Sequence, residues 1–223
     1  MQFRHEWKHE ISYVDMLSLR SRLSVFMQQD GHAVNGRYKI RSLYFDNFQD
    51  KALLEKINGV NMREKFRVRY YNDDLSFILL EKKSKVNGLC SKEKAVITLE
   101  EARLIADRDI ESISKSEKPL VKELCYKMQT EGLEPKTIVD YIREPFVYAP
   151  GNVRVTLDYD IRTGLMGTDF LSSDCVMVPA GNAPVILEVK WDEFLPAVIR
   201  DAVQVWGTHT SAFSKYAACR IYG

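Results

Sequence analysis

The chain has 223 residues, of which 45% are hydrophobic and 28% are charged, a composition typical of a folded globular protein. Its 32 Lys and Arg residues almost balance its 31 Asp and Glu residues, so the formal net charge is +1. A chain this close to neutral has no bulk electrostatic attraction to nucleic acid or to an anionic membrane. Any binding of anions must therefore come from charges that the fold sorts locally.

The cysteines and the hydropathy pattern indicate a cellular location. Cys90, Cys125, Cys175 and Cys219 are far apart and form no CxxC pair, which is typical of unpaired thiols in a reducing compartment. The first ten residues contain no apolar signal core, and the chain has no apolar run long enough to span a bilayer. We therefore expect a soluble cytoplasmic protein without a membrane segment.

The first half of the chain predicts mainly strands. Strands are expected at residues 3–13, 36–47, 60–72, 76–86 and 89–98. The last two are joined by an Asn-Gly turn, which is a strong hairpin signal. A helix is expected over 15–31, with Asp15 as its N-cap, and Thr98 with Glu101 forms a capping box that opens a helix over 98–109.

The second half predicts further strands and the remaining helices. Strands are expected at 137–149, 152–164, 169–179 and 183–194, and helices at 118–132, 195–207 and 211–223. Most links between strands are short, which favours an antiparallel meander that closes toward a barrel. The predicted fold is α+β, a single domain over 1–223 built on an antiparallel eight-stranded β-barrel with inserted and C-terminal helices.

Strand parity sorts the charges, because residues two apart on a strand share a face. Arg67 and Arg69 share one face, and Phe66 and Val68 lie on the other. Further same-face pairs are Glu81 with Lys83, Lys92 with Lys94, Arg154 with Thr156, and Glu188 with Lys190.

Two interpretations of these charged faces remain open. In one, each sheet has an apolar face under helices and a charged face in water. In the other, the strands curl so that the cations converge on an interior, where an uncompensated charge costs several kcal/mol. A polyanion rich in phosphate oxygens would supply the compensation, since Arg and Lys bind phosphate well.

Nine short motifs, in this order, resemble the VTC domain, the polyphosphate polymerase domain of the vacuolar transporter chaperone complex. The motifs are RxExK (4–8), RSLYFD (41–46), FRVRYY (66–71), LEKK (80–83), SKEKA (91–95), YIREPF (141–146), VRVTLD (153–158), ILEVK (186–190) and FSKY (213–216). That family also occurs as free-standing bacterial proteins and belongs to the triphosphate tunnel metalloenzyme, or CYTH-like, superfamily. The resemblance implies an eight-stranded tunnel lined with basic residues.

The resemblance also implies roles for individual residues. The side chains expected to act on phosphate during catalysis are Lys8, Arg67, Arg69, Lys83, Arg143, Arg154 and Lys215. Those expected to bind substrate are Lys92, Lys94, Lys190 and Ser214, with the choice between Lys92 and Lys94 left open. Glu188 corresponds to the glutamate of the family that binds a metal, expected to be Mn²⁺ or Mg²⁺.

The chain departs from the family and superfamily patterns in two ways. The inositol-phosphate-sensing domain and the membrane segment of eukaryotic members are not found in it. Glu6, Lys8 and Glu10 replace the strict ExExK cluster of the cyclase and hydrolase branches. This difference argues against adenylate cyclase and thiamine triphosphatase activity.

The function that the resemblance implies is transfer of the γ-phosphate of ATP to a growing polyphosphate chain, with no side-chain nucleophile. The expected partners are a nucleoside triphosphate and inorganic polyphosphate, and not nucleic acid. Two alternatives stay open: a non-catalytic polyphosphate- or triphosphate-binding module, and a tripolyphosphate hydrolase of the same fold.

The segment HEWKH (5–9) matches the HExxH pattern of zinc peptidases. That motif requires a helix, on which histidines four residues apart meet over one metal. Here Trp7 and Ile11 alternate with polar residues as in a strand. We therefore expect His5 and His9 on an outward strand face and not at a zinc site.

Overall fold

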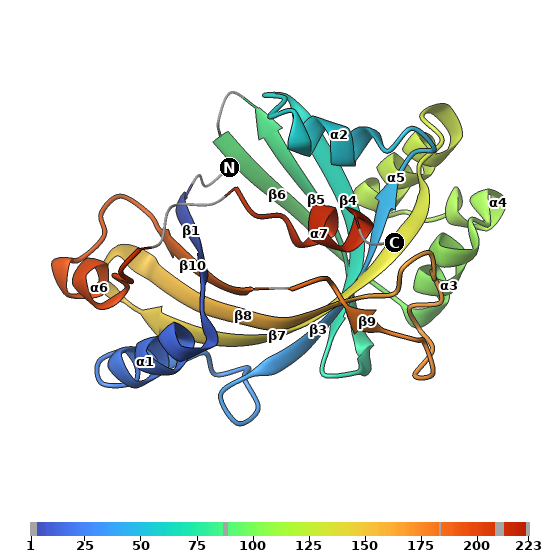
Figure 1. Ribbon diagram of the computed structural model, residues 1–223. Helices are drawn as coiled ribbons and strands as arrows, with labels where there is room; N and C mark the ends of the chain where they lie inside the picture. The colour runs from blue at the N-terminus through green and yellow to red at the C-terminus, as the bar shows by residue number, and fades with distance from the viewer. Residues whose placement is uncertain (1–3, 87–88, 183, 208–211, 222–223) are drawn as a thin grey trace. The chain divides into compact units, whose positions relative to one another are not determined.

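The computed structural model describes residues 4–86, 89–182, 184–207 and 212–221 (Figure 1). The strands are β1 (His5–Ile11), β2 (Gln28–Gln29), β3 (Tyr38–Asp46), β4 (Arg63–Tyr71), β5 (Asp74–Val86), β6 (Leu89–Ile97), β7 (Glu134–Tyr148), β8 (Val153–Thr163), β9 (Val178–Pro179) and β10 (Val185–Trp191). The helices are α1 (Tyr13–Leu23), α2 (Lys51–Ile57), α3 (Leu99–Asp107), α4 (Ile110–Ile113), α5 (Pro119–Thr130), α6 (Ala197–Ala202) and α7 (Lys215–Ile221), with a 3₁₀ turn at Pro150–Asn152.

The strands pair in the order β1-β10-β8-β7-β3-β4-β5-β6, with β2 added to β7 and β9 to β8. The α+β class and the antiparallel sheet are confirmed. The order has two ends, β1 and β6, so the pairing of the described residues is that of an open sheet and not of a closed barrel. Lys92 and Lys94 lie on the terminal strand β6, and charged side chains are typical of strands that end a sheet.

The chain groups into two compact units. Unit 1 comprises Met1–Lys39, Tyr141–Ile161 and Gly181–Phe213, and unit 2 comprises Ile40–Asp140, Arg162–Ala180 and Ser214–Gly223. Strands β3, β7 and β8 contribute residues to both units. The single-domain organisation expected from the sequence stays a prediction.

In unit 1, β1, β10 and β8 pair side by side, and their side chains alternate between two faces. Leu187 and Val155 lie in the core with the buried α1 residues Met16 and Leu19. Helix α6 adds the buried Ile199 to the same core. The opposite face of these three strands therefore carries most of their charged residues, among them Lys8, Glu188 and Arg154.

In unit 2, β3, β4, β5 and β6 form a meander. Phe66, Val68 and Leu80 are fully or almost fully buried and pack against α3, α4 and α5, which include Ile105 and Leu124 (Figure 1). Burying this face explains why the intervening residues of β4 and β5 can be charged, since they point to the other side of the sheet.

Helix α1 begins earlier than the sequence predicts. Ser12 is the N-cap, and its Oγ accepts a hydrogen bond of 3.1 Å from the Asp15 backbone N–H. Asp15 is instead the third helical residue, and its carboxylate bonds back to the Ser12 N–H in a capping box. The helix ends at Leu23, and β2 follows where more helix was expected.

Two segments differ more strongly from the prediction. Helix α2 was not predicted at all. The strand expected over 169–179 is wrong except for β9, because the Phe170 carbonyl accepts a hydrogen bond from the Tyr70 hydroxyl and the Ser172 carbonyl accepts one from Arg41. These carbonyls serve side chains rather than a neighbouring strand. The Asn-Gly turn expected at 87–88 lies outside the described residues.

The HEWKH segment lies in β1, as expected from its alternation. Both histidines share the strand parity of Trp7 and Ile11. His5 is exposed, as predicted, with its ring stacked on Trp191 at 5.3 Å, whereas His9 is half-buried. None of the described helices is long and apolar enough to cross a membrane.

The stability of unit 2 should depend on the carboxylate of Asp140, which forms a buried ion pair with Arg41. Arg41 Nε donates to Asp140 Oδ1 at 2.9 Å and Arg41 Nη2 to Asp140 Oδ2 at 2.8 Å, and both residues are 5% exposed or less. Asp140→Asn should lower the free energy of unfolding by about 3–5 kcal/mol, because it leaves a buried guanidinium without its carboxylate.

Urea unfolding monitored by circular dichroism measures this loss. The control is Glu111→Gln, which removes an exposed pair with Lys115 and should change the free energy of unfolding by less than about 0.5 kcal/mol. Equal effects of the two substitutions would contradict the role given to the buried pair.

Candidate functional site

The charged residues of unit 2 gather on one face of the meander. We call this the basic face and define it by Arg67, Arg69, Lys83, Lys92 and Lys94. They share a face because Lys83 pairs with Lys92 in the register, and Glu81 pairs with both Arg67 and Lys94. Arg69 lies two residues from Arg67 on the same strand. The same-face pairs expected from the sequence are thus brought together across β4, β5 and β6.

The carboxylate of Glu81 lies at the centre of the basic face. Its Oε2 accepts a hydrogen bond of 2.7 Å from Arg67 Nε and lies 3.8 Å from Arg69 Nη1, while Lys92 forms an ion pair with its Oε1. Burial would raise the pKa of Glu81, but the charges of Arg67, Arg69 and Lys92 outweigh it and hold the pKa well below its ordinary value. Glu81 therefore stays ionised and offsets part of the repulsion among the cations.

Arg67 and Arg69 are also held by residues of β3. Arg67 Nη1 donates to the Tyr44 hydroxyl at 2.7 Å, and Arg69 Nε donates to Ser42 Oγ at 3.2 Å. The Arg69 side chain is 4% exposed, whereas that of Arg67 is 22% exposed. Both guanidiniums are thus fixed in place, and that of Arg67 is the more accessible to a ligand.

Helix α7 begins within the FSKY motif, at Lys215, and packs on Tyr44. The Tyr216 ring stacks on the Tyr44 ring with centroids 5.1 Å apart, and its hydroxyl donates to Asp46 at 2.7 Å. Ser214 Oγ accepts a hydrogen bond of 3.4 Å from the Ala217 N–H at the start of the helix. Lys215 is half-buried beside Tyr216. The contact of Tyr216 therefore ties the helix that bears Lys215 to the residue that holds Arg67.

The charged face of unit 1 is different, because acids and bases alternate on it. Lys8 Nζ lies 2.7 Å from Glu6 Oε1 and 3.9 Å from Glu188 Oε2. Lys190 forms ion pairs with Glu188 and, at 3.4 Å, with Glu6. Burial opposes the charge of Lys8, but Glu188 and Glu6 raise its pKa above the ordinary value. Two carboxylates and two ammonium groups thus form one network.

The two arginines expected in unit 1 are both anchored by acids. Arg143 Nε and Nη2 each donate to the Asp158 carboxylate at 2.6 Å. Arg154 Nη2 lies 2.9 Å from Asp30 Oδ2 and donates to the Tyr38 hydroxyl at 2.6 Å. Arg143 is thus neutralised by a bidentate pair, whereas Arg154 has donor groups beyond its ion pair.

Two buried polar atoms next to the Glu188 network have no hydrogen-bond partner among the described residues. They are Arg154 Nε and Thr156 Oγ1. In the register, Arg154 is opposite Lys190 and Thr156 is opposite Glu188. A buried polar atom without a partner is costly, so these atoms mark a place where a polar ligand or water would bind.

The fit of a divalent metal to Glu188 can be tested on these contacts. The described residues contain no group of three or more His, Cys, Asp or Glu side chains able to hold a metal. Glu188 and Glu6, however, contact the same two lysines. Mg²⁺ commonly binds one or two carboxylates together with phosphate oxygens, so this pair fits a metal that arrives with a phosphate ligand and not an all-protein site.

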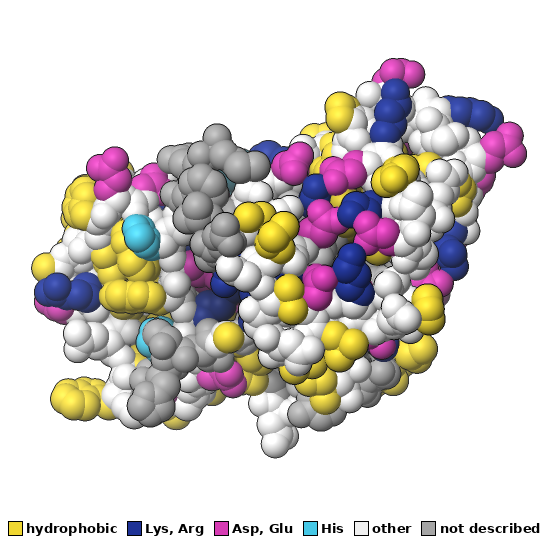
Figure 2. All heavy atoms as spheres, turned by 90° about the horizontal axis from the view of Figure 1, so that it is seen from above, with side chains coloured by type: hydrophobic (Ala, Val, Ile, Leu, Met, Phe, Trp, Pro, Cys, Tyr) yellow, Lys and Arg dark blue, Asp and Glu magenta, His cyan; other side chains and the backbone are white. Residues whose placement is uncertain are grey.

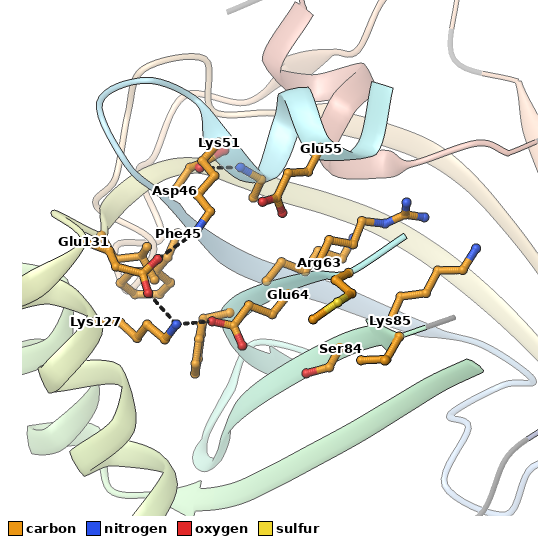
Figure 3. A pocket seen from close by; sticks show the side chains of 16 residues that line it. Phe45, Asp46, Lys51, Glu55, Arg63, Glu64, Ser84, Lys85, Lys127 and Glu131 are labelled. Atoms are coloured by element: carbon orange, nitrogen blue, oxygen red, sulfur yellow. Dashed lines mark hydrogen bonds and ion pairs between the residues drawn. The ribbon is translucent and has the colours of Figure 1, made fainter. Parts of the chain in front are cut away.

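Unit 2 has a pocket of about 300 Å³ that contains none of the predicted site residues (Figure 3). Its carboxylates and lysines neutralise one another: Lys127 Nζ lies 2.5 Å from both Glu64 and Glu131, and Lys51 lies 2.9 Å from Glu131. Figure 2 likewise shows a surface on which acidic and basic side chains intermingle. The basic face is therefore a stronger candidate for anion binding than this pocket.

The motif assignments missed two residues that contact Arg67 of the basic face, Glu81 and Tyr44. Glu81 shares the strand parity of Lys83, so its face was predictable although its role was not. Tyr44 lies within RSLYFD, and its position opposite Arg67 depends on the pairing of β3 with β4. A local sequence pattern does not specify that register.

The stabilisation by Glu81 should depend on pH. Since the pKa of Glu81 is lowered in the folded state, its contribution is fully present above the ordinary value of 4.5 and is lost as the pH falls below that value. Glu81→Gln should lower the free energy of unfolding by about 3–5 kcal/mol near neutral pH, and the gap to the wild type should narrow toward about pH 3.

Urea unfolding at several pH values measures the difference in the free energy of unfolding between the wild type and Glu81→Gln. Glu93→Gln on the same hairpin is the control, because Glu93 lies on the opposite face with half of its side chain exposed and should have little effect. A gap for Glu81→Gln that is the same at every pH would contradict the proposed ionic role.

Comparisons with known proteins address the fold and the family. A candidate adenylate cyclase from Bacillus halodurans superposes with a TM-score of 0.52 at 14% identity, covering 85% of this chain and 80% of that chain. The PH1012 protein from Pyrococcus horikoshii OT3 superposes with a TM-score of 0.51 at 11% identity, covering 97% and 99%. Both are similar in fold. The search of curated protein sequences found no match.

The family model of the VTC domain matches residues 3–221, nearly the whole chain. The match spans every motif that carries the resemblance, from the RxExK segment of β1 to the FSKY segment at α7. The chain therefore belongs to the VTC domain family.

Proposed function

We propose that this protein is a polyphosphate polymerase-like phosphotransferase, which transfers the γ-phosphate of ATP to a growing polyphosphate chain. The observation that carries the proposal is the basic face, on which Arg67, Arg69 and Lys92 surround the single carboxylate group of Glu81. Membership of the VTC domain family and the fold shared with a candidate cyclase support binding of polyphosphate or triphosphate.

The charge balance of the basic face suits a polyanion. One carboxylate cannot neutralise three cations, so positive charge remains beside the half-exposed Lys92 and the partly exposed Arg67. A phosphate chain offers many oxygens with distributed negative charge, which arginine binds by paired N–H groups and lysine as a point charge. Lys83, Lys94, Lys215 and Ser214 are proposed to extend these contacts along the chain.

In unit 1, we assign Lys8, Arg154 and Lys190 to contacts with phosphoryl groups. For Arg143, whose Nε and Nη2 are both engaged by Asp158, the proposed contact uses its remaining guanidinium N–H groups. The Nε of Arg154 and the hydroxyl of Thr156 are buried polar atoms that a phosphate oxygen would satisfy. Glu188, with Glu6, would hold a divalent ion, whose charge would neutralise phosphate oxygens. Lys8 and Lys190 would then be released from these carboxylates to contact phosphate.

The proposed reaction needs no covalent intermediate on the protein. A terminal phosphate oxygen of the acceptor attacks the γ-phosphorus of ATP, the new P–O bond forms, and ADP leaves as the β–γ bridge breaks. The residues act by holding both substrates in line and by stabilising the charge that develops on the phosphoryl oxygens. The same contacts would serve a tripolyphosphate hydrolase or a binding module, so the products must distinguish them.

The deciding experiment is incubation with γ-labelled ATP and Mn²⁺ or Mg²⁺. We expect label in long chains on a denaturing gel, together with ADP. Release of labelled phosphate alone would replace the proposal with a hydrolase, and tight binding of tripolyphosphate without turnover would replace it with a binding module. Absence of both binding and turnover would refute a phosphate-handling function.

Removing the arginines tests the basic face directly. Arg67→Ala with Arg69→Ala should weaken tripolyphosphate binding at least about tenfold, because hydrogen bonds to charged groups contribute about 1.5–3 kcal/mol each. Isothermal titration calorimetry measures the affinity.

The matched control is Arg103→Ala with Lys115→Ala. It removes the same charge from two exposed positions in and after the helices that cover the opposite face of unit 2. Similar losses in the two double variants, both shown to be folded by their thermal melts, would mean that the basic face is not the binding site.

A further inference from the structure

Tyr44 lies beside the basic face, although no assigned role includes it. It sits on β3 directly opposite Arg67 in the register and is 3% exposed. Its hydroxyl oxygen accepts a hydrogen bond of 2.7 Å from Arg67 Nη1. Its ring stacks on Tyr216 of α7, with centroids 5.1 Å apart and an angle of 25° between the planes. These contacts fix Tyr44 against the more accessible of the two arginines.

The surroundings of Tyr44 are cationic. The charged and titratable groups that face it directly are Lys65, Arg67 and Arg69 of β4 and Tyr216 of α7. Glu81 of β5 is one contact further away, because it accepts a hydrogen bond from Arg67. Lys92 of β6 forms an ion pair with Glu81. Lys65 Nζ lies 5.5 Å from the centre of the Tyr44 ring, and Arg67 Cζ lies 5.6 Å from it. Tyr216 stays neutral, because burial and the Asp46 carboxylate raise its pKa.

This setting favours loss of the Tyr44 proton. Burial opposes ionisation of the phenol, but the charges of Arg67, Lys65 and Arg69 outweigh it and lower the pKa of Tyr44 to about 7. In the described part of the chain, no side chain or carbonyl accepts a hydrogen bond from the Tyr44 hydroxyl. The cations around the hydroxyl thus favour the phenolate, and the hydrogen bond from Arg67 is compatible with either protonation state.

We propose that Tyr44 is a positioning residue whose protonation controls how strongly Arg67 binds phosphate. The neutral hydroxyl holds the guanidinium by accepting one of its N–H bonds and leaves its charge available to a ligand. The phenolate holds the same group more tightly and cancels one positive charge of the basic face. A phosphate chain therefore binds the neutral form more strongly.

Linkage gives this role a measurable consequence. When phosphate binds to a molecule in which Tyr44 is a phenolate, the oxygen of Tyr44 takes up one proton from solvent. Affinity for phosphate should then fall as the pH rises through 7. Lys92, whose pKa is lowered to about 8, adds its own pH dependence. A purely structural role, in which Tyr44 only packs on Tyr216, would give the wild type and a Tyr44→Phe variant the same dependence of affinity on pH. The inference rests on the proposed binding of phosphate by the basic face.

The test compares the wild type with Tyr44→Phe, using tripolyphosphate as the probe between about pH 6 and about pH 9. Tripolyphosphate itself titrates in this range, but the ratio of the two dissociation constants cancels that effect. Bound tripolyphosphate should raise the pKa of Tyr44 in the wild type. For each unit of that rise, the affinity of the wild type, divided by that of Tyr44→Phe, should fall about tenfold between the lowest and the highest pH.

The matched control is Tyr126→Phe, which removes an exposed hydroxyl from α5 and should keep the wild-type profile. If both proteins bind tripolyphosphate and the ratio of their dissociation constants does not change with pH, the role of Tyr44 is overturned and the proposed function stands. Failure of the wild type to bind tripolyphosphate would overturn the proposed function and this role together.

Ultraviolet difference spectra provide a readout that needs no turnover. We expect a tyrosinate signal near neutral pH in the wild type that is absent from Tyr44→Phe and is reduced when tripolyphosphate is added. Should Tyr44→Phe not fold, Arg67→Met serves instead, because loss of that cation should move the tyrosinate signal to higher pH. No tyrosinate signal near neutral pH in the ligand-free wild type would overturn the inference.

Discussion

The charged face of unit 2 depends on the buried carboxylate of Glu81. Cations two residues apart on a strand repel each other, and a sheet that places such pairs on adjacent strands needs a compensating charge at their centre. Glu81 provides it, with Arg67 at hydrogen-bond distance and Arg69 and Lys92 close by. Because one carboxylate only partly neutralises these groups, the fold can hold them together and still leave positive charge for an anion.

The Arg41–Asp140 pair shows the contrast within the same unit. There a single arginine meets a single carboxylate in a bidentate contact, and both residues are almost completely buried. Such a pair satisfies its own charge and offers little to a ligand. The number of cations around each carboxylate, and their exposure, separates a structural ion pair from a candidate binding group.

The charged face of unit 1 follows a third pattern. Glu6, Lys8, Glu188 and Lys190 nearly balance one another, so this network has little net charge. In the function proposed above, a divalent cation would replace the lysines at these carboxylates, and the lysines would then contact phosphate oxygens. The Nε of Arg154 and the hydroxyl of Thr156, beside this network in the register, have no hydrogen-bond partner in the part of the chain that the structure describes.

The sequence by itself determined which residues share a face, because the period of a strand is a local property. It placed Arg67 with Arg69 and Glu188 with Lys190, and it located most strands and the helix opened by Thr98. Only the tertiary structure decided which neighbour each charge meets. The contact of Arg67 with Tyr44 joins residues 23 apart, and its existence depends on the register of β3 against β4. The same holds for the segment over 169–179, whose carbonyls bind the distant side chains of Tyr70 and Arg41 instead of forming a strand. Strand register, and hydrogen bonds between a side chain and a distant carbonyl, depend on free energies of interaction between distant segments. A local sequence pattern does not contain this information.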